Sequence, residues 1–394
     1  MKLWKRTINR SLFFKRKTPL EKQKYIAKTL KGLEEPLKQE LAEIGIQKCR
    51  VTNRAIEFHA TKEQLYKANY TFRTAINILK PLFQFKAKNE QELYDKVKEF
   101  EWENIFGLDK TFAISHSVRS DIFTHSQYIS LKTKDAIVDR FRDKFNSRPS
   151  VDPKQPDVKF NLFIRGEKCS LLLDTSGDAL FKRGYRIETN MAPLNEVMAA
   201  GLISLSGWDK NSTLVDPMCG SGTICIEAGM MLCNIPAGYY RTSFGFFNMA
   251  DFDLDLWKKV RNEAKEKIDL NKGITIHGSD LAMKSIRISQ KNLDNVPDLK
   301  RIVRFKGQDV LELTAPKKSG TMIINPPYGE RIYKDEVAIL YQRLGDYLEE
   351  EFKGYTLGIL SSNKEALDLI HLNKTRTVDL MNGSIECDYR IYKV

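Results

Sequence analysis

The sequence predicts an α/β protein with a doubly wound, Rossmann-like sheet in its C-terminal half and two smaller α+β units in front of it. Three observations lead to this fold class. The chain of 394 residues is long for a single core. Strand-like and helical segments alternate regularly from residue 190 onward. Residues 25–175 show less regular runs of both kinds, which is typical of α+β units.

The net charge of +13 is unevenly distributed along the chain. Residues 1–30 carry +9, residues 31–190 carry +5 and residues 191–394 carry −1. We therefore expect the N-terminal half to face a polyanion and the almost neutral C-terminal half to carry out chemistry. This division predicts separate binding and catalytic modules.

Residues 1–24 form a basic leader for which we expect a flexible structure. Residues 1–20 contain no acid, and no apolar core of the kind found in secretory signals. A disordered tail and a basic arm on RNA, with Trp4, Phe13 and Phe14 available for stacking, both fit this composition. A mitochondrial presequence fits less well, because the basic residues are mostly lysine and serine is scarce.

The N-terminal half is predicted to hold two units, at residues 25–85 and 86–175. The first contains a strand at 25–30, a helix at 32–45, a strand at 50–60 and a helix at 62–72. The second contains a helix at 90–100, a strand at 111–118, a helix at 126–145 and strands at 158–166 and 168–175. The last two strands flank a turn signal at Gly166.

A linker at 176–192 leads to the predicted doubly wound domain at 193–394. We expect seven strands, at 212–216, 274–280, 302–309, 321–325 and 355–362 and in a terminal antiparallel hairpin around Asn382-Gly383. Helices are predicted at 192–205, 223–232, 253–268, 284–293 and 336–352.

Four predicted strand ends in this domain carry residues that suit ligand binding. The first strand runs into Asp216 and a glycine turn, where the backbone can approach a ligand in front of a helix N-terminus. The next two strands end in Asp280 and Asp309, and a single such acid is commonly a helix cap. Together with Asn325 at the fourth strand end, they predict one nucleoside-sized crevice at the carboxyl edge of the sheet.

The fourth strand end is a stiff elbow. Residues 322–324 are apolar and predict a buried strand, which Pro326 and Pro327 terminate because proline has a fixed φ and no N–H donor. Asn325 and Tyr328 are therefore expected at the edge where open α/β sheets bind ligands.

The composition excludes several classes of protein. No stretch of about 18 consecutive apolar residues exists, so we expect no transmembrane helix. The six cysteines are scattered without a C-x-x-C pair, which favours reduced thiols in a cytosolic protein. The five histidines show no ligand spacing, so we expect no metal site.

Residues 216–228 (DPMCGSGTICIEA) and 325–331 (NPPYGER) resemble the class I S-adenosylmethionine-dependent methyltransferases that act on exocyclic amines. Within that class the sequence is similar to the 23S ribosomal RNA guanine-N2 methyltransferases that carry a THUMP domain. Residues 174–200 match the linker and first helix of that family, and residues 25–45 and 129–141 resemble its ferredoxin-like start and its THUMP helix. The resemblance covers about residues 25–394.

The resemblance implies a ferredoxin-like unit, a THUMP domain and a methyltransferase domain, in that order, with S-adenosylmethionine as the cofactor. It places Asp280 on the ribose hydroxyls and Asp309 near the adenine. The residues that it places around the methionine end are Asp216, Gly220, Ser221, Gly222 and Thr223. Asn325 borders the cofactor as well as the substrate.

Guanine N2 is a poor nucleophile because its lone pair is delocalised into the ring. The Asn325 side-chain oxygen and the Pro326 carbonyl can accept both N–H groups and aim the lone pair at the methyl group. Tyr328 would stack on the extruded base. Positioning and electrostatics then supply most of the rate, without a dedicated general base.

Several other residues could serve the substrate. The segment 234–257 reads as an aromatic insert that either borders the target base or packs on the surface. Six residues are candidates for RNA contact, with a solvated surface position as the alternative for each: Lys132, Lys134, Arg140, Arg183, Tyr185 and Arg331.

The predicted function is methylation of a guanosine N2 amine in large-subunit ribosomal RNA, or its assembly intermediate, in the cytoplasm. A transfer RNA guanine-N2 methyltransferase is the nearest alternative. The Asn-Pro-Pro-Tyr motif also serves adenine-N6 and glutamine methylation, so it does not identify the amine alone. A non-catalytic RNA-binding ribosome-assembly factor is the alternative of another class, and intact Asn325, Asp280 and Gly220 argue against it.

Overall fold

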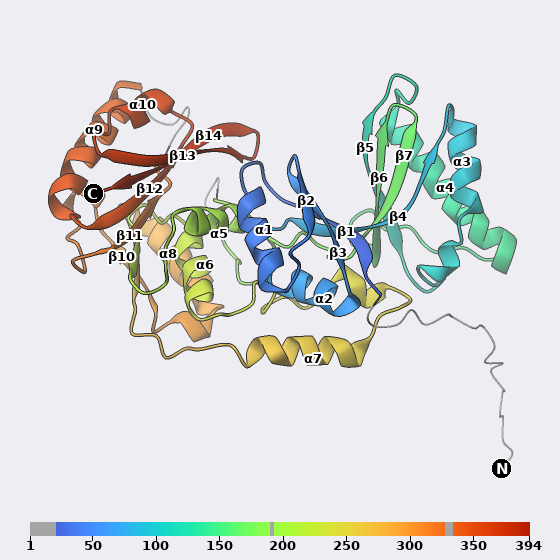
Figure 1. Cartoon of the computed structure of the whole chain (residues 1–394), viewed down its shortest axis with the longest axis horizontal. Helices are drawn as coiled ribbons and strands as arrows, with labels where there is room; N and C mark the ends of the chain where they lie inside the picture. Colours follow the sequence, from blue (N-terminus) through green and yellow to red (C-terminus); the bar gives the residue numbers. More distant parts are fainter. Residues whose placement is uncertain (1–20, 190–192, 328–333) are drawn as a thin grey trace, which may run out of the picture.

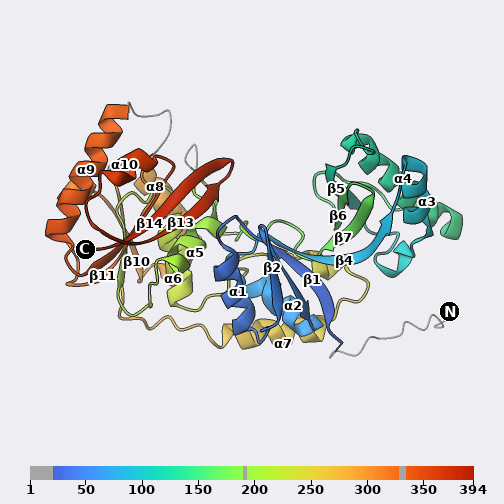
Figure 2. The same ribbon diagram turned by 45° about the horizontal axis from the view of Figure 1, so that its top comes forward.

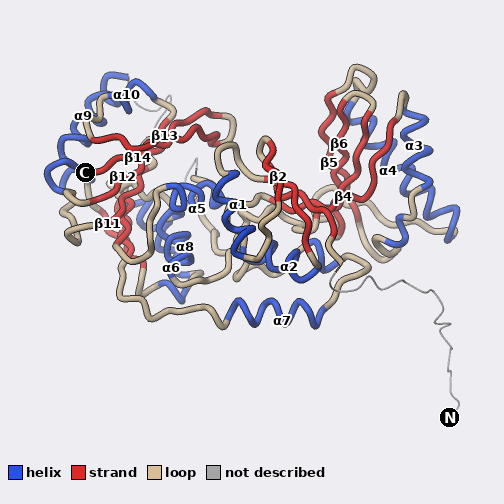
Figure 3. The backbone as a smooth tube through the Cα atoms, in the orientation of Figure 1, coloured by secondary structure: helices blue, strands red, loops and turns tan. Residues whose placement is uncertain are grey.

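The computed structural model of the chain describes residues 21–189, 193–327 and 334–394. The molecule is elongated, and two seven-stranded sheets follow one another along its length (Figure 1). Figure 3 shows the strands of both sheets together with the helices that pack on them. Among the described residues, no helix combines the length and the apolar character needed to cross a membrane.

The N-terminal sheet has the strand order β2-β3-β1-β4-β7-β6-β5. Its strands are β1 (Gln23–Lys28), β2 (Cys49–Thr52), β3 (Ala55–Ala60), β4 (Asn77–Lys86), β5 (Phe112–Arg119), β6 (Val158–Arg165) and β7 (Lys168–Asp174). Its helices are α1 (Glu34–Glu43), α2 (Lys62–Thr71), α3 (Glu90–Glu99) and α4 (Ser126–Phe145). The short helix η1 covers Trp102–Asn104.

Strand β4 joins the two α+β units into one sheet. Its first residues pair with β1 and the rest pair with β7, with a register irregularity between Pro81 and Phe83. No strand is predicted here from the sequence, and a proline inside an apolar run is unusual for a central strand. The structure accommodates Pro81 at the irregularity, where the ladder is already interrupted.

The predicted strand at 50–60 is instead a hairpin. Strands β2 and β3 pair in antiparallel fashion, and the turn between them places Arg54 at a φ of 60°. The signal was weak because Asn-Arg lacks the glycine of the strongest hairpin turns.

The C-terminal sheet has the order β10-β9-β8-β11-β12-β14-β13, and β14, the second strand of the terminal hairpin, is the one strand that runs antiparallel to the other six. This confirms the predicted seven-stranded, doubly wound sheet. Its strands are β8 (Thr213–Asp216), β9 (Ile276–Asp280), β10 (Val303–Gly307), β11 (Gly320–Ile324), β12 (Tyr355–Ser361), β13 (Asn373–Asn382) and β14 (Ile385–Lys393).

The helices of this half are α5 (Glu196–Leu205), α6 (Thr223–Leu232), α7 (Leu254–Lys265), α8 (Met283–Asp294), α9 (Lys334–Glu351) and α10 (Lys364–Asp368). Three short helices complete it, η2 (Gly245–Asn248), η3 (Pro297–Leu299) and η4 (Val310–Glu312). Helix α6 is buried along its whole length except at Met231, as expected for a helix between the sheet and the rest of the molecule.

The aromatic insert packs against the N-terminal half. Phe246 stacks on Tyr66 of α2 with ring centroids 4.4 Å apart, and Trp257 of α7 meets Tyr70 of α2 edge-on at 5.2 Å. Helix α7 runs alongside α2, far from the C-terminal sheet (Figures 1 and 2). From the sequence, the insert is expected either to border the target base or to pack on the surface. It packs, but its aromatic side chains lie in an internal core and not on the surface.

The two halves of the chain differ in charge and yet share their cores. Leu33, from the loop before α1, packs against Gly201 of α5, where an added Cβ would lie 2.5 Å from its side chain. Phe244 and Trp257 belong to the same apolar cluster as Tyr25 and Leu37. The two halves are therefore not structurally independent, because apolar residues from both exclude water together. The separation of binding from catalysis stays a prediction.

We expect the insert to stabilise the whole protein. Replacing Phe246, which is 1% exposed, by alanine should lower the free energy of unfolding by about 3–5 kcal/mol, because it leaves a cavity between the halves. Urea unfolding followed by tryptophan fluorescence measures this. The control is Leu254→Ala in the same insert, where the side chain is 52% exposed and the change should stay within about 0.5 kcal/mol. Equal effects of the two variants would contradict a shared core.

Candidate active site

The four predicted strand ends meet at one edge of the C-terminal sheet. Strands β9, β8 and β11 are parallel neighbours, and their carboxyl ends carry Asp280, Asp216 and Asn325 respectively. The strand order reverses between β8 and β11, which makes this edge a topological switch point of the kind that binds ligands. Strand β10 ends earlier than predicted, so that Asp309 follows it as the cap of η4 and accepts from the Leu311 N–H at 3.0 Å.

The glycine turn is fixed to the end of the neighbouring strand. The Gly220 N–H donates to Asp280 Oδ2 at 2.9 Å, and the Cys219 N–H donates to the Ser279 carbonyl at 2.8 Å. Asp280 Oδ1 also accepts from the Ala282 N–H at 2.9 Å. Asp280 therefore orients the turn through backbone hydrogen bonds.

Gly222 is required by both its conformation and its surroundings. Its φ of +79° lies in the left-handed region, and it caps the N-terminus of α6. An added Cβ would lie 2.6 Å from the Phe305 ring and 2.9 Å from Ser289 Cβ. A side chain here would displace the turn from β10 and α8.

Two residues that the sequence analysis did not single out hold the turn from behind. Arg186 donates to the Thr223 hydroxyl at 2.8 Å, and its Nε lies 2.9 Å from Glu196 Oε1 in an ion pair without hydrogen-bond alignment. Asn292 of α8 donates to the Ser221 carbonyl at 3.1 Å while its Oδ1 accepts from the Ile187 N–H. Arg186 lies within residues 174–200, which resemble the family's linker and first helix, whereas nothing local marks Asn292.

Asp216 is buried at the end of β8, with one hydrogen bond from the Met218 N–H at 3.3 Å. Burial, and next the negative charge of Asp280, raise the pKa of Asp216 to about 8. Asp216 is therefore mostly protonated at neutral pH and adds little negative charge to this edge of the sheet.

Asn325 presents an acceptor without a partner. Its Oδ1 is inaccessible to solvent and has no hydrogen-bond partner within the described part of the chain. Pro326 is buried and Pro327 is exposed, as expected for an elbow after β11. Tyr328 and Arg331 lie outside the described residues.

Arg183 and Tyr185 do not face RNA. Both are 1% exposed, and both bind Glu227 of α6, the Arg183 Nε and the Tyr185 hydroxyl each lying 3.2 Å from Oε1. Arg183 also donates to the Arg73 carbonyl at 2.6 Å. The prediction of RNA contact by these two residues is therefore wrong, because the linker packs into the core and buries them.

The candidate cations of α4 already have local partners. Lys134 lies 2.6 Å from Asp135, and Arg140 lies 2.7 Å from Glu103. Lys132 lies 4.7 Å from the centre of the Tyr94 ring. RNA contact by this helix stays a prediction.

No group of three or more acids, histidines or cysteines among the described residues could hold a metal ion. The free cysteines, such as Cys219 and Cys225, are mostly buried. Burial raises the pKa of both of these thiols, which makes them unreactive.

Three family models match successive parts of the chain. Residues 24–79 match the RlmL ferredoxin-like domain, residues 87–174 match the THUMP domain, and residues 183–391 match the RMKL-like methyltransferase domain.

Solved structures show the same arrangement over almost the whole chain. SMU.472, assigned as a methyltransferase and crystallised with SAH, is 31% identical with a TM-score of 0.86, covering 94% of this chain and 98% of its own. A predicted N6-adenine-specific DNA methylase from Listeria monocytogenes is 26% identical with a TM-score of 0.84, covering 95% and 96%. TrmN from Thermus thermophilus, at 16% identity and a TM-score of 0.70, covers 94% and 99% and shares the fold.

The high pKa of Asp216 predicts a pH-dependent loss of stability. The folded state holds a proton that the unfolded state releases near the ordinary value of 3.8, so this contribution to stability is complete below that pH and is lost as pH rises toward about 8. In the ligand-free protein, Asp216→Asn should therefore flatten the decline of the urea midpoint between about pH 5 and pH 8. The control is Asp255→Asn, since the Asp255 side chain is 96% exposed. A wild-type decline that Asp216→Asn leaves unchanged would contradict the prediction.

Proposed function

The chain belongs to the RMKL-like methyltransferase family, and from this premise we propose that it methylates the exocyclic N2 amine of a guanosine in RNA. The family predicted from the sequence is thereby confirmed, while the base and the type of RNA belong to the proposal. The THUMP domain beside the catalytic sheet supports RNA as the substrate. We place the enzyme in the cytoplasm.

The cofactor is S-adenosylmethionine, which when bound supplies a methyl group on a positively charged sulfur. SAH, the ligand of the relative SMU.472, is what remains of this cofactor after that transfer. The residues present fit it: a glycine turn opens in front of the α6 N-terminus, with a carboxylate at the end of the next strand. We propose that the turn holds the methionine end, that Asp280 binds the ribose and that Asp309 lies near the adenine.

The observation that carries the proposal is the unpartnered Oδ1 of Asn325. A buried acceptor without a donor costs about 1–3 kcal/mol, and the position of this one at a ligand-binding edge supports a ligand that supplies the donor. An exocyclic amine has two N–H groups, and the Asn325 Oδ1 and the Pro326 carbonyl can each accept one. Held in this way, the nitrogen directs its lone pair toward the methyl group, about 3 Å away in a reactive pose.

Other groups at this edge position the target base and set the local charge. We propose that Tyr328 stacks on the target base, whose purine ring must leave its own stack to reach the site. Asp216 is protonated near neutral pH and so adds little negative charge. Proton loss from the methylated amine needs no dedicated base, since the product ammonium is strongly acidic and water suffices.

The substrate is proposed as large-subunit ribosomal RNA, free or in an assembly intermediate. The RlmL-type ferredoxin-like unit supports this choice over transfer RNA. A relative assigned to adenine N6 keeps that amine as the second candidate, because the same two acceptors would serve it. Mass mapping of modified nucleosides in ribosomal and transfer RNA from a deletion strain distinguishes three candidates: guanine N2 in large-subunit RNA, guanine N2 in transfer RNA, and adenine N6. A missing N2-methylguanosine in large-subunit RNA supports the proposal, and a missing N6-methyladenosine overturns the assignment of the base.

Removing the acceptor should stop catalysis and spare the cofactor. We expect Asn325→Ala to retain less than roughly a tenth of the wild-type rate, a barrier increase above about 1.4 kcal/mol, with cofactor affinity changed only a few-fold. Single-turnover methylation of RNA and calorimetry measure the two quantities. Asn373→Ala, at an exposed asparagine of the same sheet, is the matched control. An Asn325→Ala variant that keeps more than roughly a tenth of the wild-type rate would refute the amine-holding role.

Asp280 should govern cofactor affinity. Asp280→Ala removes the acceptor of the Gly220 N–H and the proposed ribose contact, so we expect binding weaker by about 1.5–3 kcal/mol in a protein that still folds. Asp346→Ala, at an exposed acid of α9, controls for loss of charge. Unchanged affinity of Asp280→Ala in calorimetry would place the ribose site elsewhere.

A further inference from the structure

Four cations lie side by side across four neighbouring strands at one end of the N-terminal sheet. Lys86 of β4 pairs in register with Lys168 of β7, Lys168 with Arg165 of β6, and Arg165 with Arg119 of β5. We call these four residues the cation row. Adjacent strands are about 4.8 Å apart, so the row spans roughly 14 Å.

The cation row lies on the face of the sheet that α3 and α4 leave open. The chain neighbours of these cations, Phe85, Val118, Ile164 and Cys169, pack into the core beneath those helices. Because successive side chains of a strand point to opposite faces, the row projects from the other face. All four cations are exposed.

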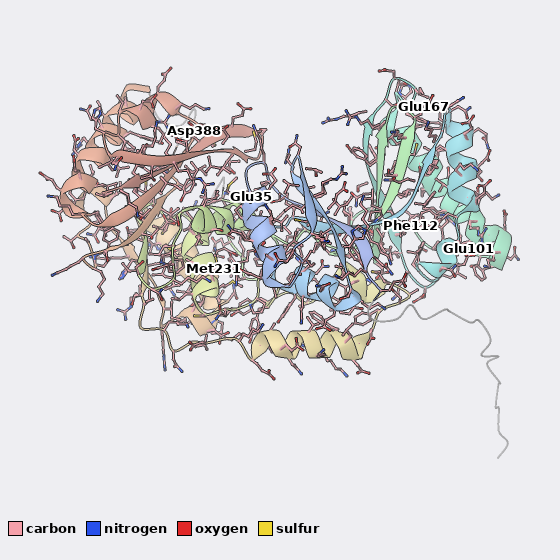
Figure 4. All side chains as sticks on the ribbon, viewed as in Figure 1. Glu35, Glu101, Phe112, Glu167, Met231 and Asp388 are labelled. Carbon is pink, nitrogen blue, oxygen red and sulfur yellow. The ribbon has the colours of Figure 1, made fainter. Side chains whose placement is uncertain are left out.

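Nothing among the described residues neutralises the cation row. None of its members forms an ion pair there, in contrast to Lys134 and Arg140 of α4. The one carboxylate within the hairpin turn is Glu167, at the tip of the unit (Figure 4). Like charges directly opposite each other on neighbouring strands are destabilising, so the free protein carries a cost that a bound polyanion would remove.

An exposed aromatic ring adjoins the row on the same face. Phe163 lies two residues before Arg165 on β6 and is 44% exposed. Its partners in register are Ser117 of β5 and Ser170 of β7, and Gln84 follows beside Ser170. A ring among hydroxyl and amide groups, next to a line of cations, can stack on a base while the cations hold the adjacent phosphates.

We propose that this open face of the N-terminal sheet binds a single-stranded segment of RNA, with phosphates on the cation row and a base on Phe163. The inference rests on the proposed function for the identity of the polyanion. A single strand is favoured over a duplex because paired bases are stacked on each other and cannot lie against Phe163. The surface differs from the α4 surface, on which the sequence places its candidate cations.

The test measures the affinity of the full-length protein for a short fluorescent single strand and for the same sequence as a duplex, at several salt concentrations. Arg165→Gln/Lys168→Gln should weaken single-strand binding about tenfold or more and reduce the slope of log K against log salt by roughly 1.4, at about 0.7 per phosphate. Phe163→Ala should weaken single-strand binding by roughly five- to a hundredfold without changing that slope.

The matched control is Lys96→Gln/Lys98→Gln on α3, which removes the same charge from the opposite side and should bind RNA as wild type does. Thermal unfolding at low salt gives a second readout. Arg165→Gln/Lys168→Gln removes repulsion between neighbouring strands, so this variant should melt no lower than wild type.

Several results would overturn the inference. Wild-type affinity of both the row variant and Phe163→Ala would do so while leaving RNA methylation, and hence the proposed function, intact. A preference for the duplex would exclude the single strand, and loss of binding in Lys132→Gln/Lys134→Gln alone would assign RNA to α4. A wild-type protein that neither binds nor methylates RNA would refute the proposed function as well.

Discussion

The geometry of the site depends on one buried ion pair. The side chains of Arg183 and Glu227 are fully shielded from solvent, and Arg183 also donates to the carbonyls of Leu180 and Arg73. Glu227 lies one turn after Thr223 on α6, so the pair ties the helix behind the glycine turn to the linker and to the ferredoxin-like unit. Desolvating two charges costs several kcal/mol per ion. The guanidinium is held by Glu227 and by two backbone carbonyls at once, and we therefore assign the pair a role in positioning and not in net stability.

Further contacts connect the region of this ion pair to the glycine turn on one side and to the N-terminal half on the other. Toward the cofactor, Arg186 reaches the Thr223 hydroxyl and Asn292 reaches the Ser221 carbonyl. Toward the N-terminal half, Arg73 donates to the carbonyl of Ile235 and the aromatic insert fills the contact with α2. Strand β4 then continues into the THUMP sheet. The sheet proposed to hold RNA is therefore connected to the catalytic edge through packed elements, although the charge distribution alone suggests independent modules.

Local signals in the sequence predicted the residues of the site. The burial of Arg183 and the pairing of β4 depend on long-range packing. Asp216 and Asn325 each follow an apolar run directly, and Asp280 ends the next strand-like segment, so the strand ends and their common edge could be inferred without a structure. Arg183 could not be assigned correctly, because a basic residue in a charged linker looks exposed until its partner, 44 residues later in the sequence, is known. Strand β4 was missed for a related reason, since Pro81 opposes a strand locally and the sheet on both sides enforces one.

Two features of the structure are unfavourable in the free protein. The Asn325 Oδ1 is a buried acceptor without a donor, and the cation row sets like charges opposite one another. Each destabilises the free protein, by an unpaired polar group in one case and by repulsion in the other. One ligand would relieve both, because a single-stranded nucleic acid offers phosphates to the row and an exocyclic amine to the elbow. Local conflicts that a common ligand resolves are expected at functional sites, and under the proposed function these two would be contacts with one RNA.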